Sequence, residues 1–149
     1  MSFKDTTSGE RALSYFEEGN NCSVSVFRSL SEMSGDHGTI DPSIAMGFGG
    51  GMGKNGLVCG AVSAGIMAIG LQAKGRKKAE VYELVDTFLT DFKDHFGTVN
   101  CRELLGADLK TEEGMDYLKT EGRKKCSEFV RYAADKAFEM TKPLSDEKA

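Results

Sequence analysis

The amino-acid sequence predicts an all-α protein, a single-domain helical bundle of about six to eight helices around a buried central helix rich in glycine and alanine. No segment shows the sustained alternation of apolar and polar residues that marks a half-buried strand. Apolar residues instead recur at intervals of three and four in several stretches, which is the helical pattern. Residues 55–73 carry no charge and have no polar face, so other elements must surround that stretch.

Length and composition indicate one globular domain. A chain of 149 residues buries roughly 70% of the surface of its unfolded state. Its content of 40% hydrophobic and 28% charged residues is ordinary for such a domain. We expect a single helical domain over residues 1–140, which contains all four cysteines, and a flexible charged tail over residues 141–149. A net charge of −4 argues against nucleic acid as a partner, because nucleic acid binds basic faces.

The sequence also predicts a cytoplasmic protein. Its first ten residues lack the charged and then apolar pattern of a secretory signal. The apolar stretch at residues 55–73 approaches the length of a membrane span, but glycines, Ser63 and Gln72 interrupt it. We therefore expect a buried helix and no membrane insertion. Four cysteines in a chain without an export signal are not typical of a disulfide framework.

The first half of the chain is expected to form two helices and a short turn. Thr7, with a glutamate three residues later, makes a capping box before an amphipathic helix. The asparagines at positions 20 and 21 are good N-caps for a second helix that begins at Cys22. An Asp-Pro pair at positions 41 and 42 predicts a short helical turn.

The second half is expected to hold the central helix and the longest amphipathic helices. Asn55 is a suitable cap for the central helix. Residues 76–96 form the clearest amphipathic helix, and Asn100, with a glutamate three residues on, predicts the cap of another. A short helical piece at residues 111–118 leads to a last helix, whose apolar stripe covers residues 126–140.

The four cysteines are the strongest chemical signal; they are Cys22, Cys59, Cys101 and Cys126. The first three lie near the start of predicted helices, where free N–H groups and the helix dipole favour a thiolate. Cys126 directly follows three basic residues, which lower a thiol pKa in the same way. Thiols with lowered pKa values suit metal ligation or thiol–disulfide exchange. Each cysteine could equally be a small apolar filler, since their wide spacing contains no C-x-x-C pair.

A glycine-rich loop precedes the central helix. Residues 51–56 match the dinucleotide pattern G-x-G-x-x-G, but neither the preceding strand nor the following acidic residue is present. We interpret the loop as a tight turn whose N–H groups could face an anion or the sulfurs of a cluster. Neither His37 nor His95 has an identifiable partner, so both are interpreted as structural or solvated. The glycines expected to support the cysteine site are Gly49, Gly50, Gly51, Gly53 and Gly60.

The contexts of the cysteines resemble a known family. The segments GNNCSVSVF, GFGGGMGKNGLVCGAVSAGIMAIGL, NCRELLG and KKCSEFVRYAADKAFE resemble the C-GCAxxG-C-C family of redox-active proteins, over about residues 10–139. Ala64 occupies the second glycine position of that pattern, and Gly65 follows one residue later. The resemblance implies a helical domain in which the four cysteines converge. The family is similar to the non-haem part of the split-Soret cytochromes c, in which equivalent thiols are thought to hold an iron–sulfur centre.

Three hypotheses about function remain open on the sequence. The leading one is a redox or electron-transfer protein, rather than a substrate-turning enzyme, with an unknown donor or acceptor protein. In it, Cys22, Cys59, Cys101 and Cys126 bind an iron–sulfur cluster, with 2Fe–2S as the expected type and zinc as a variant. The chain has no C-x-x-C-H, so no haem is expected.

The second hypothesis is a metal-free thiol–disulfide protein in which Cys59 reacts with Cys22 or Cys101. The third is a non-catalytic, partner-binding helical domain in which the cysteines only pack. A homodimer is a further expectation, because Phe27 and Phe138 are placed on exposed helix sides.

Overall fold

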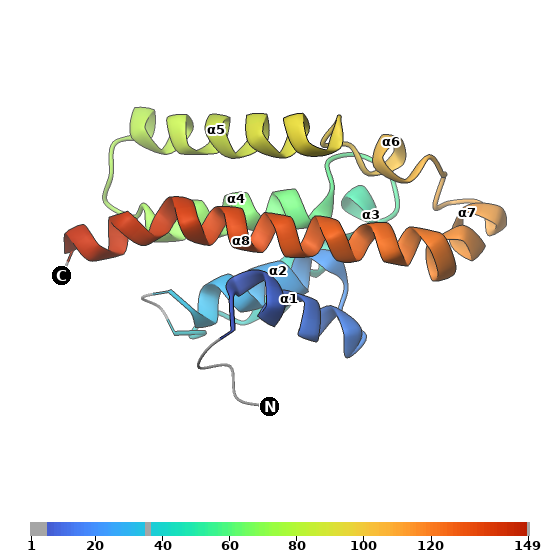
Figure 1. Ribbon diagram of the computed structural model, residues 1–149, viewed down its shortest axis with the longest axis horizontal. Coiled ribbons are helices and arrows are strands. Elements are labelled where there is room, and N and C mark those ends of the chain that lie inside the picture. Colours follow the sequence, from blue (N-terminus) through green and yellow to red (C-terminus); the bar gives the residue numbers. More distant parts are fainter. Residues whose placement is uncertain (1–5, 35–36, 149) are drawn as a thin grey trace.

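The computed structural model describes residues 6–34 and 37–148 (Figure 1). Its α-helices are α1 (Ser8–Glu17), α2 (Cys22–Glu32), α3 (Gly49–Met52), α4 (Gly60–Gln72), α5 (Lys78–Phe96), α6 (Cys101–Leu105), α7 (Glu112–Tyr117) and α8 (Arg123–Lys148). A 3₁₀ helix, η1 (Pro42–Phe48), precedes α3, and a π-helical turn, η2 (Leu118–Gly122), leads into α8. These residues contain no strand, and the predicted all-α class is confirmed. Two predictions fall partly outside the described ranges: the absence of a signal rests in part on residues 1–5, and the expected tail ends at residue 149.

The helices are arranged in three layers (Figure 1). Helix α5 is one outer layer, α4 and α8 pack together in the middle, and α1 and α2 form the other outer layer. Helix α8 runs the length of the molecule, and the short helices α3, α6 and α7 gather near its N-terminal end. One end of the bundle is therefore built from short helices and loops.

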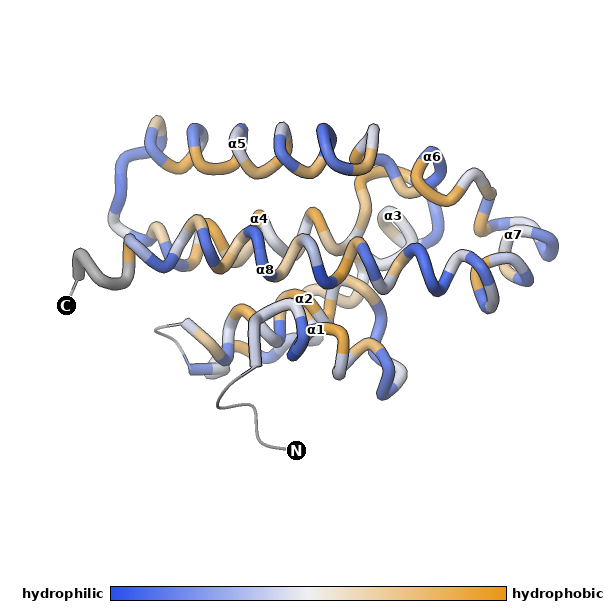
Figure 2. The backbone as a smooth tube through the Cα atoms, in the orientation of Figure 1, coloured by the Kyte–Doolittle hydropathy of each residue, from blue (hydrophilic) through white to orange (hydrophobic). Residues whose placement is uncertain are grey.

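Helix α4 is the buried central helix that the sequence predicts. Its Ala61, Val62, Ala64 and Ile69 are fully buried, and Figure 2 shows apolar residues on the faces that the long helices turn toward one another. Small residues let the neighbouring helices come close. Within the described ranges, no helix combines the length and the hydropathy that crossing a bilayer would require.

The central helix begins later than predicted. Asn55 is not its cap; α4 starts at Gly60, and Cys59 occupies the N-cap position. Residues 56–59 instead pair with residues 99–102, where the Cys59 N–H donates to a backbone carbonyl at 2.8 Å. Two segments so distant in the sequence pair only in the folded chain, so no local pattern could locate this boundary.

The last helix extends beyond the predicted boundary at residue 140. Helix α8 continues to Lys148. Thr141, the first residue of the expected tail, is buried, and its Oγ1 donates to the Ala137 carbonyl at 2.7 Å. The tail therefore starts inside a helix, because this residue packs on the bundle.

Capping predictions hold where the cap is a local hydrogen bond. Thr7 Oγ1 accepts from the Glu10 N–H, and Asn21 Oδ1 accepts from the Val24 N–H. At α6, Asn100 is the N-cap residue as predicted, but its side chain makes no capping bond; its amide donates to Glu103 Oε1 at 2.7 Å.

The expected exposure of Phe27 is also wrong. Phe27 is only 2% exposed and belongs to the core, while Phe138 is half-buried. The sequence argument for a homodimer therefore loses one of its two residues.

Candidate four-cysteine site

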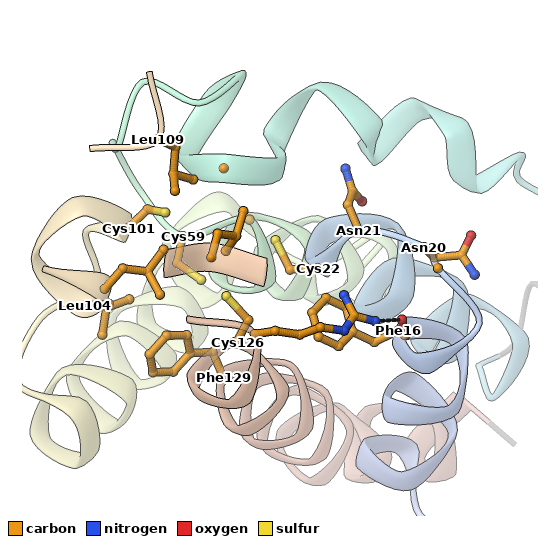
Figure 3. A pocket seen from close by; sticks show the side chains of 16 residues that line it. Phe16, Asn20, Asn21, Cys22, Cys59, Cys101, Leu104, Leu109, Cys126 and Phe129 are labelled. Atoms are coloured by element: carbon orange, nitrogen blue, oxygen red, sulfur yellow. Dashed lines mark hydrogen bonds between the residues drawn. The ribbon is translucent and has the colours of Figure 1, made fainter. Parts of the chain in front are cut away.

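All four cysteines line one cavity at the end of the bundle where the short helices gather (Figure 3). Cys22 opens α2, Cys59 caps α4, Cys101 opens α6, and Cys126 lies in the first turn of α8. Figure 3 shows the four side chains directed toward a common space. The cavity has a volume of about 250 Å³. Its apolar wall consists of Phe16, Leu104, Leu105, Leu109, Leu118 and Phe129.

The thiols surround this space without meeting at a point. All four are free. Among the described residues, no three His, Cys, Asp or Glu side chains are grouped closely enough to hold a single metal ion. The structure thus brings the four predicted cysteines into one site, where they line a cavity and do not converge on a single point.

Backbone pairing joins two of the cysteines. The Cys59 N–H donates to the Val99 carbonyl at 2.8 Å, and the Cys101 N–H donates to the Leu57 carbonyl at 2.7 Å. These bonds hold the starts of α4 and α6 together, although 42 residues of sequence separate the two cysteines. The sequence carries no signal for this pairing, because it involves a single isolated bridge.

The glycine-rich loop, which includes α3, is a left-handed turn, so α3 is not a regular right-handed helix. Residues 50–54 all have positive φ angles, from 61° at Gly53 to 72° at Lys54. Glycine adopts this conformation freely, whereas other L-residues do so at a cost of about 1–2 kcal/mol each. The turn is closed by the Gly53 N–H, which donates to the Gly49 carbonyl at 2.9 Å. The repeated glycines are thus explained by backbone handedness.

The supporting glycines make room for the cysteines in different ways. A Cβ on Gly60 would lie 2.7 Å from the sulfur of Cys22. One on Gly51 would lie 2.7 Å from the Cβ of Cys101.

The other three supporting glycines stand further from the sulfurs or act through the backbone. Gly50 lines the cavity with its backbone, and Gly49 packs against Asn21. Gly53 has no close neighbour and serves only the turn.

The thiol pKa values differ from the prediction. Burial raises the pKa of Cys101 to about 11 and that of Cys126 to about 12, and neighbouring thiolates add to both effects. Burial also raises the pKa of Cys22 and, still more, that of Cys59. The expected lowering by helix starts is wrong for the metal-free site, because desolvation disfavours the charged form more than the helix N–H groups favour it.

Backbone N–H groups nevertheless point at the sulfurs. The pKa of Cys22, raised by burial, is drawn down by hydrogen bonds from the Gly50 and Ala61 N–H groups. The Ala61 and Val62 N–H groups act on the pKa of Cys59 in the same way. A thiolate in this cavity would therefore find hydrogen-bond donors already in place.

Arg123 lines the cavity, and sequence reasoning treats it only as one of three basic residues before Cys126. Its Nη2 donates to the Phe16 carbonyl at 2.6 Å. Its position close to Cys126 is evident from the sequence, but two lysines follow it, and the sequence does not show which of the three faces the site.

The two histidines lie elsewhere. His95 stacks on Tyr132 with ring centroids 4.5 Å apart, between α5 and α8. His37 belongs to the loop before η1 and has a positive φ of 51°. Neither lines the cysteine cavity.

Comparisons with known proteins identify a family. The model of a family described as "Putative redox-active protein (C_GCAxxG_C_C)" matches residues 20–140, which include all four cysteines. No curated protein and no solved structure matches the chain.

Proposed function

Because the chain belongs to the C_GCAxxG_C_C family of redox-active proteins, we propose that it transfers electrons through an iron–sulfur cluster held by Cys22, Cys59, Cys101 and Cys126. The observation that supports this is the meeting of four thiols, each from the start of a different helix, around one largely apolar cavity. Such a cluster supplies one-electron chemistry when it is bound.

The donor set fits this group. Iron–sulfur clusters of the 2Fe–2S and 4Fe–4S types are held by four cysteine thiolates. The four thiols here surround a volume and are not grouped around one ion, which supports a cluster over a single zinc ion. We favour the 2Fe–2S type, as the smaller of the two groups.

The protein contributes an apolar wall and hydrogen bonds. Leucines and phenylalanines make up this wall, and the N–H groups of Gly50 and Ala61 are directed at the Cys22 sulfur. Donors to a ligating sulfur stabilise negative charge and so tune the reduction potential. Ligation would release the protons that the buried thiols retain in the metal-free protein.

The raised pKa values argue against the metal-free alternative. Thiol–disulfide exchange requires a thiolate as the nucleophile. With pKa values raised to about 11 and 12, Cys101 and Cys126 are protonated at neutral pH, and the pKa values of Cys22 and Cys59 are shifted in the same direction. A metal deprotonates the thiols that coordinate it, whereas exchange needs a thiolate without such help, so the raised pKa values count against exchange more than against ligation.

The test is the iron and sulfide content of the protein after anaerobic purification or reconstitution. We expect a coloured protein with two irons and two sulfides per chain for a 2Fe–2S cluster. Replacement of each cysteine by serine should remove or weaken the colour. Val26→Ala is the matched control: Val26 is buried in α2 but does not line the cavity, so this variant loses stability and retains iron.

Two results would contradict the proposal. One is a colourless, iron-free protein after reconstitution. The other is an iron content that falls as much in Val26→Ala as in the serine variants, because the loss of iron would then reflect loss of stability and not loss of a ligand. Zinc at one per chain would support the variant in which the thiols hold a single ion.

A further inference from the structure

We propose that Arg123 is a positioning charge of the four-cysteine site, one that raises the reduction potential of the group held there. This inference rests on the function proposed above. Arg123 is the one charged side chain among the described residues that line the cavity; the remaining wall is apolar or neutral apart from the thiols. A single fixed cation beside four thiolates is a strong local electrostatic feature.

The π-helical turn η2 places Arg123 on the cavity wall. In an α-helix, residues five apart lie on different faces, because one turn takes 3.6 residues. In a π-helical turn, the i→i+5 hydrogen bonds widen the turn, so such residues lie nearer to a common face. Leu118 and Arg123 are five apart, and both line the cavity. The irregular turn therefore directs the arginine at the site.

The guanidinium is held in place. Its Nη2 donates to the Phe16 carbonyl at 2.6 Å, and its carbon lies 4.2 Å from the centroid of the Phe16 ring. That carbonyl belongs to the last turn of α1, where a helix dipole favours a cation. The other side of Arg123 is exposed to solvent, so the charge sits at the mouth of the cavity.

The two neighbouring lysines are directed elsewhere. Lys124 pairs with Glu121 at 3.1 Å, and Lys125 lies over the ring of Tyr117 at 5.4 Å. Neither lines the cavity. Of the three consecutive cations, only Arg123 therefore shares the cavity wall with the thiols.

The expected effect follows from charge. When a reductant donates one electron, the negative charge in the cavity grows by one unit while the charge of Arg123 is unchanged. The cation stabilises the reduced state more than the oxidised one, so its removal makes reduction less favourable. Solvent at the mouth screens part of this interaction. We expect the equilibrium with a redox dye to change by about tenfold, which is about 59 mV for a one-electron couple.

The experiment is a spectroscopic redox titration of the loaded protein against a low-potential viologen dye, which is the electron donor. Arg123→Gln should shift the midpoint to more negative potential by about this amount. Arg123→Lys, which keeps the charge, should restore most of the potential. Lys124→Gln is the matched control: it removes the same charge one residue away and should leave the potential unchanged.

Each outcome bears on a different statement. Wild-type protein without iron and sulfide refutes the proposed function and this inference with it. If the wild-type protein is loaded, two results refute only the inference. In the first, Arg123→Gln has the same midpoint potential as wild type. In the second, Lys124→Gln shifts the midpoint potential as much as Arg123→Gln does.

A second variant covers the case in which Arg123→Gln does not hold iron. Leu118→Lys adds a cation to the same wall and should move the midpoint to more positive potential; an unchanged or lower midpoint refutes the inference.

Discussion

Replacing Gly60 by alanine tests whether close packing against a glycine positions Cys22. A Cβ at this position would lie 2.7 Å from the Cys22 sulfur, 2.8 Å from the Phe48 carbonyl oxygen and 3.2 Å from the Gly49 Cα. The first two separations are below any ordinary carbon contact, and two of the three neighbours are backbone atoms that cannot rotate away. The start of α4 must therefore shift relative to α2 and the glycine loop.

The expected cost can be estimated from two opposing effects. Forcing one methyl group into a packed site costs about 1–3 kcal/mol. Alanine is favoured over glycine in a helix by up to about 1 kcal/mol, and by less at a first residue such as Gly60. We expect Gly60→Ala to lower the free energy of unfolding by about 1–2 kcal/mol. We also expect it to reduce the iron content after reconstitution, because the sulfur of Cys22 is displaced.

Gly70→Ala is the matched control. Gly70 lies in the same helix, and a Cβ there has nothing within 4 Å, so the variant should gain up to about 1 kcal/mol. Urea unfolding of the two metal-free variants and of wild type gives both values. Equal stability of Gly60→Ala and Gly70→Ala, with unchanged iron content in both, would refute the reasoning about Gly60.

Two further changes probe other parts of the bundle. Phe88→Ala should lower the free energy of unfolding by about 3–5 kcal/mol, because the ring is fully buried and packs against Gly65 of α4; a loss below about 1 kcal/mol in urea unfolding would contradict this packing. Burial and the hydrogen bond to Glu32 raise the pKa of Tyr15 to about 12 from 10.0. A raised folded-state pKa stabilises the protein below the unfolded pKa, and this stability is lost as the pH rises from about 10 to about 12. Wild type should therefore have a larger free energy of unfolding than Tyr15→Phe below pH 10, and this difference should narrow toward pH 12. Urea unfolding at a series of pH values measures it, and a difference that does not change with pH would refute the assignment.

The sequence predicts what depends on neighbours along the chain. Thr7 and Asn21 cap their helices as expected, because the hydrogen bond spans only three residues. The buried central helix follows equally from a local property, the lack of a polar face. The choice of cysteines as the candidate site rests on their sequence contexts, and the four do meet in one cavity.

What the sequence misses depends on contacts between distant segments. The start of α4 at Gly60 is set by pairing with residues 99–102, which no local pattern encodes. Local reasoning predicts the pKa shifts of the thiols with the wrong sign, because burial depends on the whole fold while helix starts can be read locally. Arg123 cannot be separated from its two lysine neighbours without knowledge of the π-helical turn.

The left-handed turn has a consequence for the chirality of the chain. At Gly53, φ is 61°, and beyond its two chain neighbours the nearest atom to the position of an added methyl group is Asn55 Nδ2, at 4.0 Å. An L-alanine there would nevertheless be strained by its own backbone. A D-alanine is the mirror image of that residue and prefers positive φ, so the φ angle of this turn suits its backbone. It would also restrict the unfolded chain more than glycine does, which stabilises the folded state. At Gly53, the turn beside the cysteine site is thus a piece of backbone whose handedness favours the opposite enantiomer.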